Sequence, residues 1–279
     1  MLPDRPPRFR VFRGPVAVAE TIGPNVVAFG KFDGVHRGHC ALLDRAAAAA
    51  RRLGISFGAV SFERHPEVYL RRNPVPPTLV GLGEKLGLLR SAGADFVVLL
   101  PADASVLGVP AVEFARDVLR RLMDVRLVVV GSNFRFGRGG TGGVGTFREL
   151  TSVEGIDGVE VATVQVAGGP VSSTRIRQSL AQGDVELAAA LLGRTYTVRG
   201  RLARTAPSPS SPAVVAVPTG SAVPAPGRYF GSIHLPARPP LASVIIDVPS
   251  PDQRRVLYVH FGEGRPRRGP VVIAFDHRL

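Results

Sequence analysis

The sequence predicts an α/β protein in which a doubly wound parallel sheet is followed by a small β-barrel-like domain. Two observations carry this prediction. Over roughly the first 185 residues, short apolar runs alternate with helical patterns, which is typical of a parallel sheet covered on both faces. After that, short β-branched segments follow one another with turn residues between them, which indicates a small barrel or open sheet. We therefore expect two domains, residues 1–185 and 186–279.

Five strands, with helices between them, are expected in the first domain. The apolar and β-branched strand segments are 25–30, 55–62, 94–100, 125–131 and 159–166. Apolar residues at helical spacing mark the segments 38–54, 83–93 and 109–124. Gly54 ends the first of these helices, because glycine readily adopts the left-handed conformation that closes a helix.

The second domain is expected to begin with a short helix over 184–193 and to continue as strands. The strand-like segments are 195–204, 228–235, 241–248, 255–261 and 270–275. Between the first two lies the stretch 205–227, whose prolines and serines exclude a helix.

Composition narrows the classes of function. The net charge is +13, from 35 basic and 22 acidic residues, and all but two of the basic residues are arginine. The arginines are scattered and no aromatic residues are interleaved with them, so we expect no nucleic-acid partner. The single cysteine, Cys40, fits a cytoplasmic protein and excludes an intramolecular disulfide. We expect no signal peptide, no membrane-spanning segment and no membrane partner.

A glycine-rich turn with two histidines joins the first strand to the following helix. In GKFDGVHRGH, His36 and His39 stand three residues apart, with Gly38 between them. Glycine lets the backbone approach a ligand closely, and the N–H groups of a helix N-terminus attract phosphate. Two imidazoles there can donate to phosphate oxygens. The alternatives are helix capping and metal binding, although two histidines alone make a poor metal site.

Two charged residues of the same turn have two readings each. Lys31 could contact a phosphate as a point charge or simply be solvated. Asp33 could bind a water held by Mg²⁺ or hydrogen-bond the backbone of the turn, as aspartates in turns commonly do.

A second candidate phosphate site lies in the segment VSSTRIR. Ser172, Ser173 and Thr174 are typical N-cap residues. Arg175 and Arg177 follow in the first turn of the expected helix, where positive charge opposes the helix dipole. A bound anion would reverse that penalty, so this local conflict indicates function.

Two further segments carry candidate ligand groups directly after strands. In SNFRFGRGG, Asn133 is suited to hydrogen-bond a ring edge, and we expect one of Phe134 and Phe136 to pack on a flat face. In ERHPEV, His65 and Pro66 follow a strand end. His65 either faces the cleft formed by these candidate ligand groups or is a structural histidine, and the sequence leaves both interpretations open.

Five motifs resemble, in the same order, those of bacterial bifunctional riboflavin kinase/FAD synthetases. GKFDGVHRGH is similar to their G-x-F-D-G-V-H-x-G-H motif, and SFERHPEVYL, GEKLGLLRSAGAD, VVVGSNFRFG and VSSTRIR are similar to the segments that follow. The resemblance covers about residues 20 to 200. The N-terminal domain of that family is an FMN adenylyltransferase of the HxGH nucleotidyltransferase superfamily.

The resemblance implies a nucleotidyltransferase that makes FAD and pyrophosphate from ATP and FMN, with Mg²⁺ held through the phosphates. The implied catalytic residues are His36, His39 and Arg175. The implied nucleotide-binding residues are Gly30, Lys31, Phe32, Asp33, Gly38, Ser172, Ser173, Thr174 and Arg177. The implied flavin-binding residues are His65, Pro66, Asn133, Phe134, Arg135 and Phe136.

The second domain departs from the family's riboflavin kinase barrel. If VPTGS is matched to the family's F-P-T-A-N core, Ser221 replaces the asparagine. LASVIIDV resembles the strand that carries the kinase's glutamate base, and Ala242 stands in the place of that glutamate. Since alanine accepts no proton, we expect a shortened barrel without kinase activity, which braces the first domain or helps form a homo-oligomer.

Two other functions stay open from the sequence. The loop GRGGTGG and Lys31 depart from the family pattern, which leaves room for another nucleotide such as CTP, or another acceptor such as a modified flavin. The other is a flavin- or nucleotide-binding regulator without turnover, and the two intact phosphate motifs argue against it.

Overall fold

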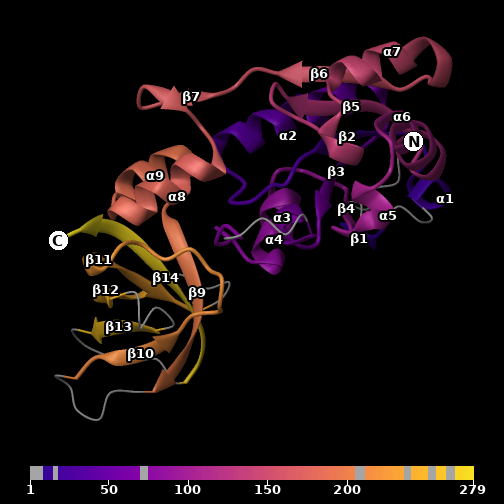
Figure 1. The fold of residues 1–279 in the computed structure, drawn as a ribbon. Helices are drawn as coiled ribbons and strands as arrows, with labels where there is room; N and C mark the ends of the chain where they lie inside the picture. The colour runs from indigo at the N-terminus through magenta and orange to yellow at the C-terminus, as the bar shows by residue number, and fades with distance from the viewer. Residues whose placement is uncertain are drawn as a thin grey trace. The chain divides into compact units, whose positions relative to one another are not determined.

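The computed structural model describes residues 9–14, 18–69, 75–204, 211–235, 240–250, 256–261 and 268–279. The chain forms two compact units. The first consists of Met1–Val75 and Leu82–Val164, and the second of Pro76–Gly81 and Gln165–Leu279. By this division the residues 165–185, which we expected in the first domain, group with the barrel (Figure 1).

A parallel sheet forms the centre of the first unit, with the strand order β1-β4-β3-β2-β5-β6. Its strands are β1 (Arg10–Arg13), β2 (Asn25–Phe29), β3 (Ser56–Phe62), β4 (Phe96–Leu100), β5 (Val125–Gly131) and β6 (Asp157–Val161). The chain passes from β2 to β3 on one side, while β5 pairs with β2 on the other. The predicted doubly wound sheet is therefore confirmed, with its switch point between β2 and β5.

Helices lie on both faces of this sheet. They are α1 (Val18–Ile22), α2 (Arg37–Leu53), α3 (Pro66–Tyr69), α4 (Leu82–Ser91), α5 (Ala104–Leu107), α6 (Ala111–Glu113), the π-helical η1 (Phe114–Leu122), the 3₁₀ turn η2 (Arg138–Gly140) and α7 (Val144–Glu154). Alternate residues of β2 enter different cores: Val27 and Phe29 one, Val26 and Ala28 the other. Successive side chains of a strand point to opposite faces, so the two cores cover the two faces of the sheet.

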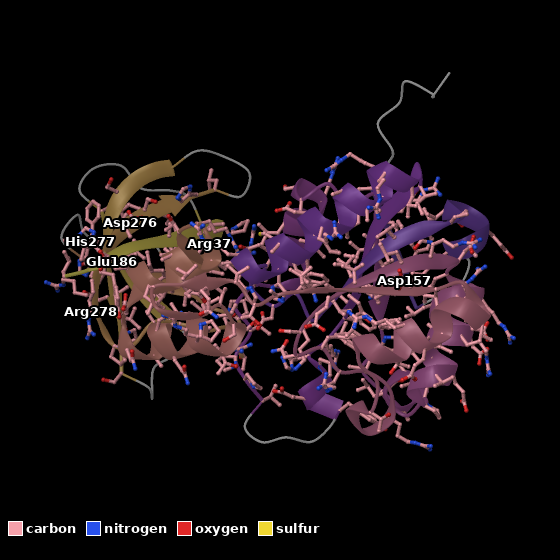
Figure 2. All side chains as sticks on the ribbon, turned by 90° about the horizontal axis from the view of Figure 1, so that it is seen from above. Arg37, Asp157, Glu186, Asp276, His277 and Arg278 are labelled. Carbon is pink, nitrogen blue, oxygen red and sulfur yellow. The ribbon has the colours of Figure 1, made fainter. Side chains whose placement is uncertain are left out.

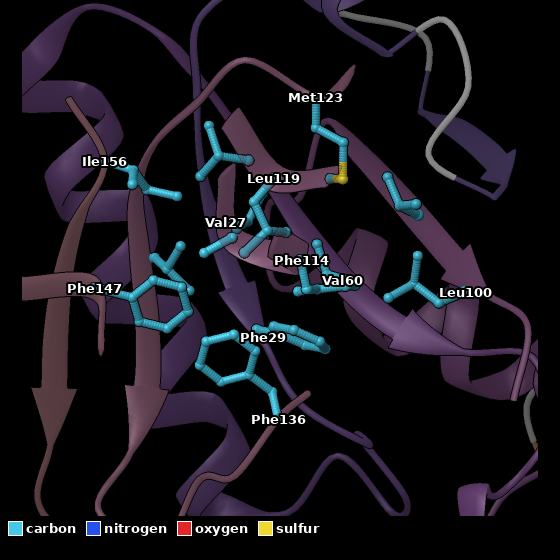
Figure 3. Close-up of a cluster of buried hydrophobic side chains, with 14 of the residues drawn as sticks. Val27, Phe29, Val60, Leu100, Phe114, Leu119, Met123, Phe136, Phe147 and Ile156 are labelled. Atoms are coloured by element: carbon cyan, nitrogen blue, oxygen red, sulfur yellow. The ribbon is translucent and has the colours of Figure 1, made fainter. Parts of the chain in front are cut away.

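Aromatic rings gather in one of the two cores (Figure 3). Phe136 and Phe147 stack with ring centroids 4.7 Å apart, and Phe29 and Phe114 stack at 6.0 Å. Phe136 comes from the loop after β5, so this core anchors that loop from below. The anchor matters for the site, because it fixes the backbone on which Phe134 and Arg135 stand.

The barrel of the second unit is closed, in the order β10-β13-β12-β11-β14-β9, so the predicted barrel is confirmed over the open sheet. Its strands are β9 (Tyr196–Arg204), β10 (Ala213–Ala216), β11 (Gly227–His234), β12 (Pro240–Val248), β13 (Val256–Phe261) and β14 (Gly269–Arg278). Before it come the short hairpin β7 (Gln165–Val166) and β8 (Gly169–Pro170), then helices α8 (Ser173–Gln182) and α9 (Val185–Leu192).

Arg278 on the last strand ties helix α8 to the barrel. Its guanidinium donates to the carbonyls of Gln182 and Pro226, both at 3.1 Å, and lies 5.9 Å from the ring centroid of Tyr229. Figure 2 shows Arg278 at the same end of this unit as Glu186 of α9. Among the residues that the structure describes, no helix is both long and apolar enough to cross a bilayer.

One close approach between neighbouring strands gives a test of the sheet packing. Gly58 of β3 pairs with Phe96 of β4, and a methyl group on Gly58 would overlap the buried ring of Phe96. That ring also packs edge-on against Phe12, with centroids 6.2 Å apart. We therefore expect Gly58→Ala to lower the free energy of unfolding by about 1–3 kcal/mol, through overpacking.

The measurement is a urea denaturation curve, with Gly87→Ala as the matched control. Gly87 is exposed on α4, and no atom lies within 4 Å of an added methyl group. Since alanine favours a helix over glycine by about 1 kcal/mol, the control variant should unfold at equal or higher urea. Equal midpoints for Gly58→Ala and the wild type would contradict this packing.

Candidate active site

The histidine turn lies at the switch point of the sheet. Residues 30–36 connect the end of β2 to the start of α2, and the loop 132–143 follows β5, the neighbour of β2 across the switch point. Ligands of doubly wound folds bind beyond the carboxyl ends of strands at such points. The motifs GKFDGVHRGH and SNFRFG therefore start from adjacent strand ends.

His36 and His39 cap helix α2 reciprocally. The backbone N–H of His39 donates to Nδ1 of His36 at 3.2 Å, and the backbone N–H of His36 donates to Nδ1 of His39 at 3.4 Å. The two rings stack with centroids 3.7 Å apart. Because each Nδ1 accepts, the proton of each neutral ring is on Nε2. Capping and phosphate binding were alternatives in the sequence, but they use different nitrogens and are compatible.

The neutral form of His39 is favoured by its surroundings. Burial lowers its pKa well below the ordinary value for histidine, and the neighbouring His36 and Lys85 lower it further. The ring of His39 is therefore neutral at pH 7, with Nε2–H as a hydrogen-bond donor.

The backbone of the turn is strained. Phe32 has a φ of 49° and Val35 a φ of 40°, and Gly34 between them has a φ of 86°. For a β-branched residue such as Val35 this is an outlier, and each such residue costs about 1–3 kcal/mol. Strain of this kind concentrates at ligand-binding turns.

Phe32 was expected among the nucleotide-binding residues, but its side chain is fully buried. Its ring centroid lies 5.1 Å from that of His39 and within the core under α2. Only the backbone of Phe32 can therefore face a ligand. The Asp33 side chain is also buried, whereas Gly30 and Gly38 are half-buried.

Lys31, Glu67 and His65 form a small polar cluster at the turn. Nζ of Lys31 lies 3.3 Å from Oε1 of Glu67, and Nδ1 of His65 lies 3.7 Å from Oε2. Lys31 thus has a carboxylate partner, which the sequence did not predict. Pro66, also an expected flavin-binding residue, is buried at the first position of α3, where proline suits a helix start.

The loop after β5 exposes some of its predicted residues and buries another. Asn133 and Arg135 are exposed, and Phe134 is half-buried, with its ring centroid 4.9 Å from that of Phe29. Phe136 was predicted to bind flavin, but its side chain is buried in the core and packs there against other rings. Of the two phenylalanines, Phe134 stays the candidate for a flavin contact, and that contact stays a prediction.

The glycines of GRGGTGG have a packing role. A methyl group on Gly137 or Gly142 would overlap Ala111 of α6, and Gly137 has a φ of 74°. Phe136 and Gly142 also exchange backbone hydrogen bonds at 3.1 and 2.9 Å. Close approach to α6 therefore explains why glycine stands at these two positions.

The second motif begins helix α8, in the other compact unit. Ser172 is the N-cap, as predicted, and its hydroxyl accepts from the backbone N–H of Arg175 at 3.1 Å. The Arg175 guanidinium donates to the carbonyls of Val166, Gly169 and Ala167 at 2.7, 2.7 and 2.8 Å. Arg175 therefore orders the β7–β8 hairpin, and its catalytic role stays a prediction.

Arg177 is held differently. Its Nε donates to the carbonyl of Pro77 at 2.6 Å, which joins α8 to the segment Pro76–Gly81 of the same unit. Ser173 and Thr174, which were also expected at the N-cap, lie in the first turn of the helix after Ser172.

Lys85 is a candidate that the sequence analysis missed. It lies in α4 with 8% of its surface exposed, and its Nζ donates to the carbonyl of Phe62 at 2.7 Å. The available signal was compositional, since Lys85 is one of two lysines in an arginine-rich chain. No group of three or more His, Cys, Asp or Glu side chains suited to a metal ion occurs within the described ranges.

The sequence matches known proteins through its first two thirds. The profile of the FAD synthetase family matches residues 19–175. The bifunctional riboflavin kinase/FMN adenylyltransferase of Escherichia coli (strain K12) is 33% identical over 177 residues, which is 63% of this chain and 56% of that protein. The protein of the same description from Pseudomonas fluorescens is also 33% identical over 177 residues, covering 63% and 57%.

The match thus spans a little more than half the length of these relatives. Among solved structures, a protein from Streptococcus pneumoniae described as a macrolide-efflux protein has a TM-score of 0.82 and covers 97% of this chain and 91% of its own. At 22% identity this likeness concerns the fold alone. Because the family profile covers more than half of the sequence, including both turn histidines, the chain belongs to the FAD synthetase family.

Proposed function

We propose that this chain is an FMN adenylyltransferase, which makes FAD and pyrophosphate from FMN and ATP. The observation that carries the proposal is the reciprocal cap of His36 and His39, because it fixes two neutral imidazoles with Nε2–H donors at the switch point of the sheet. Membership of the FAD synthetase family supports the same reaction.

In the proposed reaction, an oxygen of the FMN phosphate attacks the α-phosphorus of ATP. A new P–O–P bond forms, the bond to the β-phosphate breaks, and pyrophosphate leaves in line. The FMN phosphate is already ionised at pH 7, so no strong general base is needed. His36 and His39 donate hydrogen bonds to the α-phosphoryl oxygens, where negative charge builds up in the transition state.

The proposal also covers the other phosphate groups of ATP and a Mg²⁺ ion. For the N-terminus of α8 we retain phosphate binding through Ser173, Thr174 and Arg177, which the family resemblance implies. The residues of the turn fit a Mg²⁺ ion held by substrate phosphates, because Asp33 is the single carboxylate there and is buried. When bound, Mg²⁺ would neutralise charge on the phosphates.

ATP stays the proposed nucleotide, because the two departures from the family pattern have local explanations. Lys31 pairs with Glu67, and the glycines at 137 and 142 pack against Ala111. Neither arrangement calls for a different nucleotide or acceptor.

We propose further that the barrel lacks riboflavin kinase activity. Ala242, at the position matched to the kinase's glutamate, lies on β12 opposite Ile233 and offers no base. In the segment matched to the kinase's phosphate-binding core, the backbone around Gly220 is hydrogen-bonded to Thr78 at 2.7 and 2.8 Å. These contacts support a structural use of that segment.

The first experiment incubates the full chain with Mg²⁺ and FMN and gives ATP, CTP, GTP or UTP in parallel. We expect FAD from ATP, separated by chromatography, and no product from the other three nucleotides, because membership of the FAD synthetase family supports ATP as the nucleotide. Riboflavin with ATP is the control and should yield no FMN. Product from another nucleotide alone, or no product at all, would refute the proposed reaction, and FMN in the control would refute the loss of kinase activity.

The second experiment separates the two nitrogens of His39. In His39→Asn, the amide oxygen stands near the place of Nδ1 and keeps the cap, but the Nε2–H donor is gone. Turnover should fall about 10²- to 10³-fold, as when one oxyanion donor is lost, with little change in stability. In His39→Gln, an amide N–H lies near the place of Nε2, so turnover should fall less, and stability should change little because glutamine is a usual residue at this position of a capping box.

The measurements are kcat, FMN affinity by fluorescence titration, and urea denaturation of each variant. FMN affinity should change far less than kcat, since the donor acts in the transition state. An equal loss of both in His39→Asn would remove the assigned role.

A further inference from the structure

A buried lysine lies beside the strained turn. The chain carries 35 basic residues and only two are lysine: Lys31, in the turn, and Lys85, in α4. A lysine offers a compact donor that can lose its proton when buried, whereas an arginine cannot. Both lysines of this arginine-rich chain therefore lie in or next to the histidine turn.

The contacts of Lys85 lead directly to that turn. Its Nζ donates to the carbonyl of Phe62 at 2.7 Å and to Oγ of Ser61 at 3.3 Å. The Ser61 hydroxyl in turn donates to the carbonyl of Lys31 at 3.0 Å. That carbonyl belongs to the peptide bond between Lys31 and Phe32, and Phe32 is the first residue of the turn with a positive φ. The chain of hydrogen bonds thus ends where the strain begins.

Lys85 is coupled electrostatically to Asp33 of the turn and to His39 of α2. Burial lowers the pKa of Lys85 to about 8, and the charge of Asp33 acts in the opposite direction. The charge of Lys85 lowers the pKa of His39. The end of β3 contributes a carbonyl and a hydroxyl group rather than a charge.

We propose that Lys85 is a positioning residue: through Ser61 it holds the backbone that carries His36 and His39, and it places a positive charge beside His39. This inference rests on the proposed adenylyl transfer for its kinetic consequences, but not for its structural ones. Lys85 touches no reacting atom in this account. It acts by fixing the donors that do.

The alternative is a lysine that serves only the stability of the fold, and pH separates the two roles. Lys85 loses its proton above about pH 8, whereas the unfolded chain keeps it until about pH 10.5. Between these values the unfolded state binds more protons, so this group makes the fold more stable as the pH rises. If Lys85 positions the turn by its charge, kcat of the wild type should fall as the pH rises above about 8. Over the same pH range, the loss of this proton makes the fold more stable.

The kinetic test uses Lys85→Met, Lys85→Arg and Ser61→Ala, with Arg90→Met on the exposed side of α4 as the control. Lys85→Met removes the charge at every pH, so kcat should fall about 10²-fold, as for a misplaced catalytic group, with smaller changes in KM. The fall in kcat above pH 8 that we expect for the wild type should be absent from this variant. Lys85→Arg should recover part of kcat and also lack the alkaline loss, because arginine stays charged.

Ser61→Ala cuts the link to Lys31 and keeps the charge, so kcat should fall while the alkaline loss persists. Arg90→Met should match the wild type in both respects. If Lys85→Met does not fold, Ser61→Ala and the wild-type pH profile decide: an unchanged kcat in Ser61→Ala together with no alkaline loss in the wild type overturns the proposal. Full activity in Lys85→Met overturns it as well.

A second measurement needs no substrate. The chain has six histidines, so the few imidazole signals in an NMR spectrum can be assigned one by one. A pH titration can then follow the signal of His39 separately. In Lys85→Met the pKa of His39 should rise, because a positive charge that lowers it has been removed. An unchanged titration of His39 would contradict the proposed placement of the charge. If the wild type makes no FAD, the proposed function fails, and this titration still decides the role of Lys85.

Discussion

The reciprocal cap between His36 and His39 is the interaction on which the rest of the site depends. Nδ1 of each ring accepts a hydrogen bond from a backbone N–H, which fixes the tautomer, the ring orientation and the start of α2 at the same time. Ordinary capping boxes use serine or threonine with glutamate or glutamine, which complete the helix and stop there. Imidazoles complete the helix with one nitrogen and keep the proton on the other, so the cap also supplies ligand donors.

The strained turn is held by burial as much as by hydrogen bonds. Phe32 and Val35, the two non-glycine residues of this turn with positive φ, are both buried in the core under α2. Burying such a side chain contributes about 1.5–3 kcal/mol, which is comparable with the 1–3 kcal/mol that each strained residue costs. The strain is therefore offset where it arises.

The sequence predicts what local patterns encode and misses what depends on tertiary contacts. The long apolar strands and the N-cap Ser172 were readable, because each needs only neighbouring residues. Strand β1 was missed, since RVFR lacks an apolar run, and β10 was hidden between prolines. The burial of Phe136, the carbonyl contacts of Arg175 and the hydrogen bonds of Lys85 depend on residues far apart in the sequence, and no periodicity reports them.

Neutral donors make physical sense at this turn. A charged arginine packed as deeply as His36 would need a permanent partner, because an unpaired buried charge is strongly disfavoured. The site instead combines the neutral imidazoles of the turn with the buried Lys85 of α4, whose charge is opposed by that of Asp33. Such an arrangement offers directed N–H groups with little net charge in the absence of ligand. The geometry of the donors, more than the +13 charge of the chain, then determines which phosphate is bound.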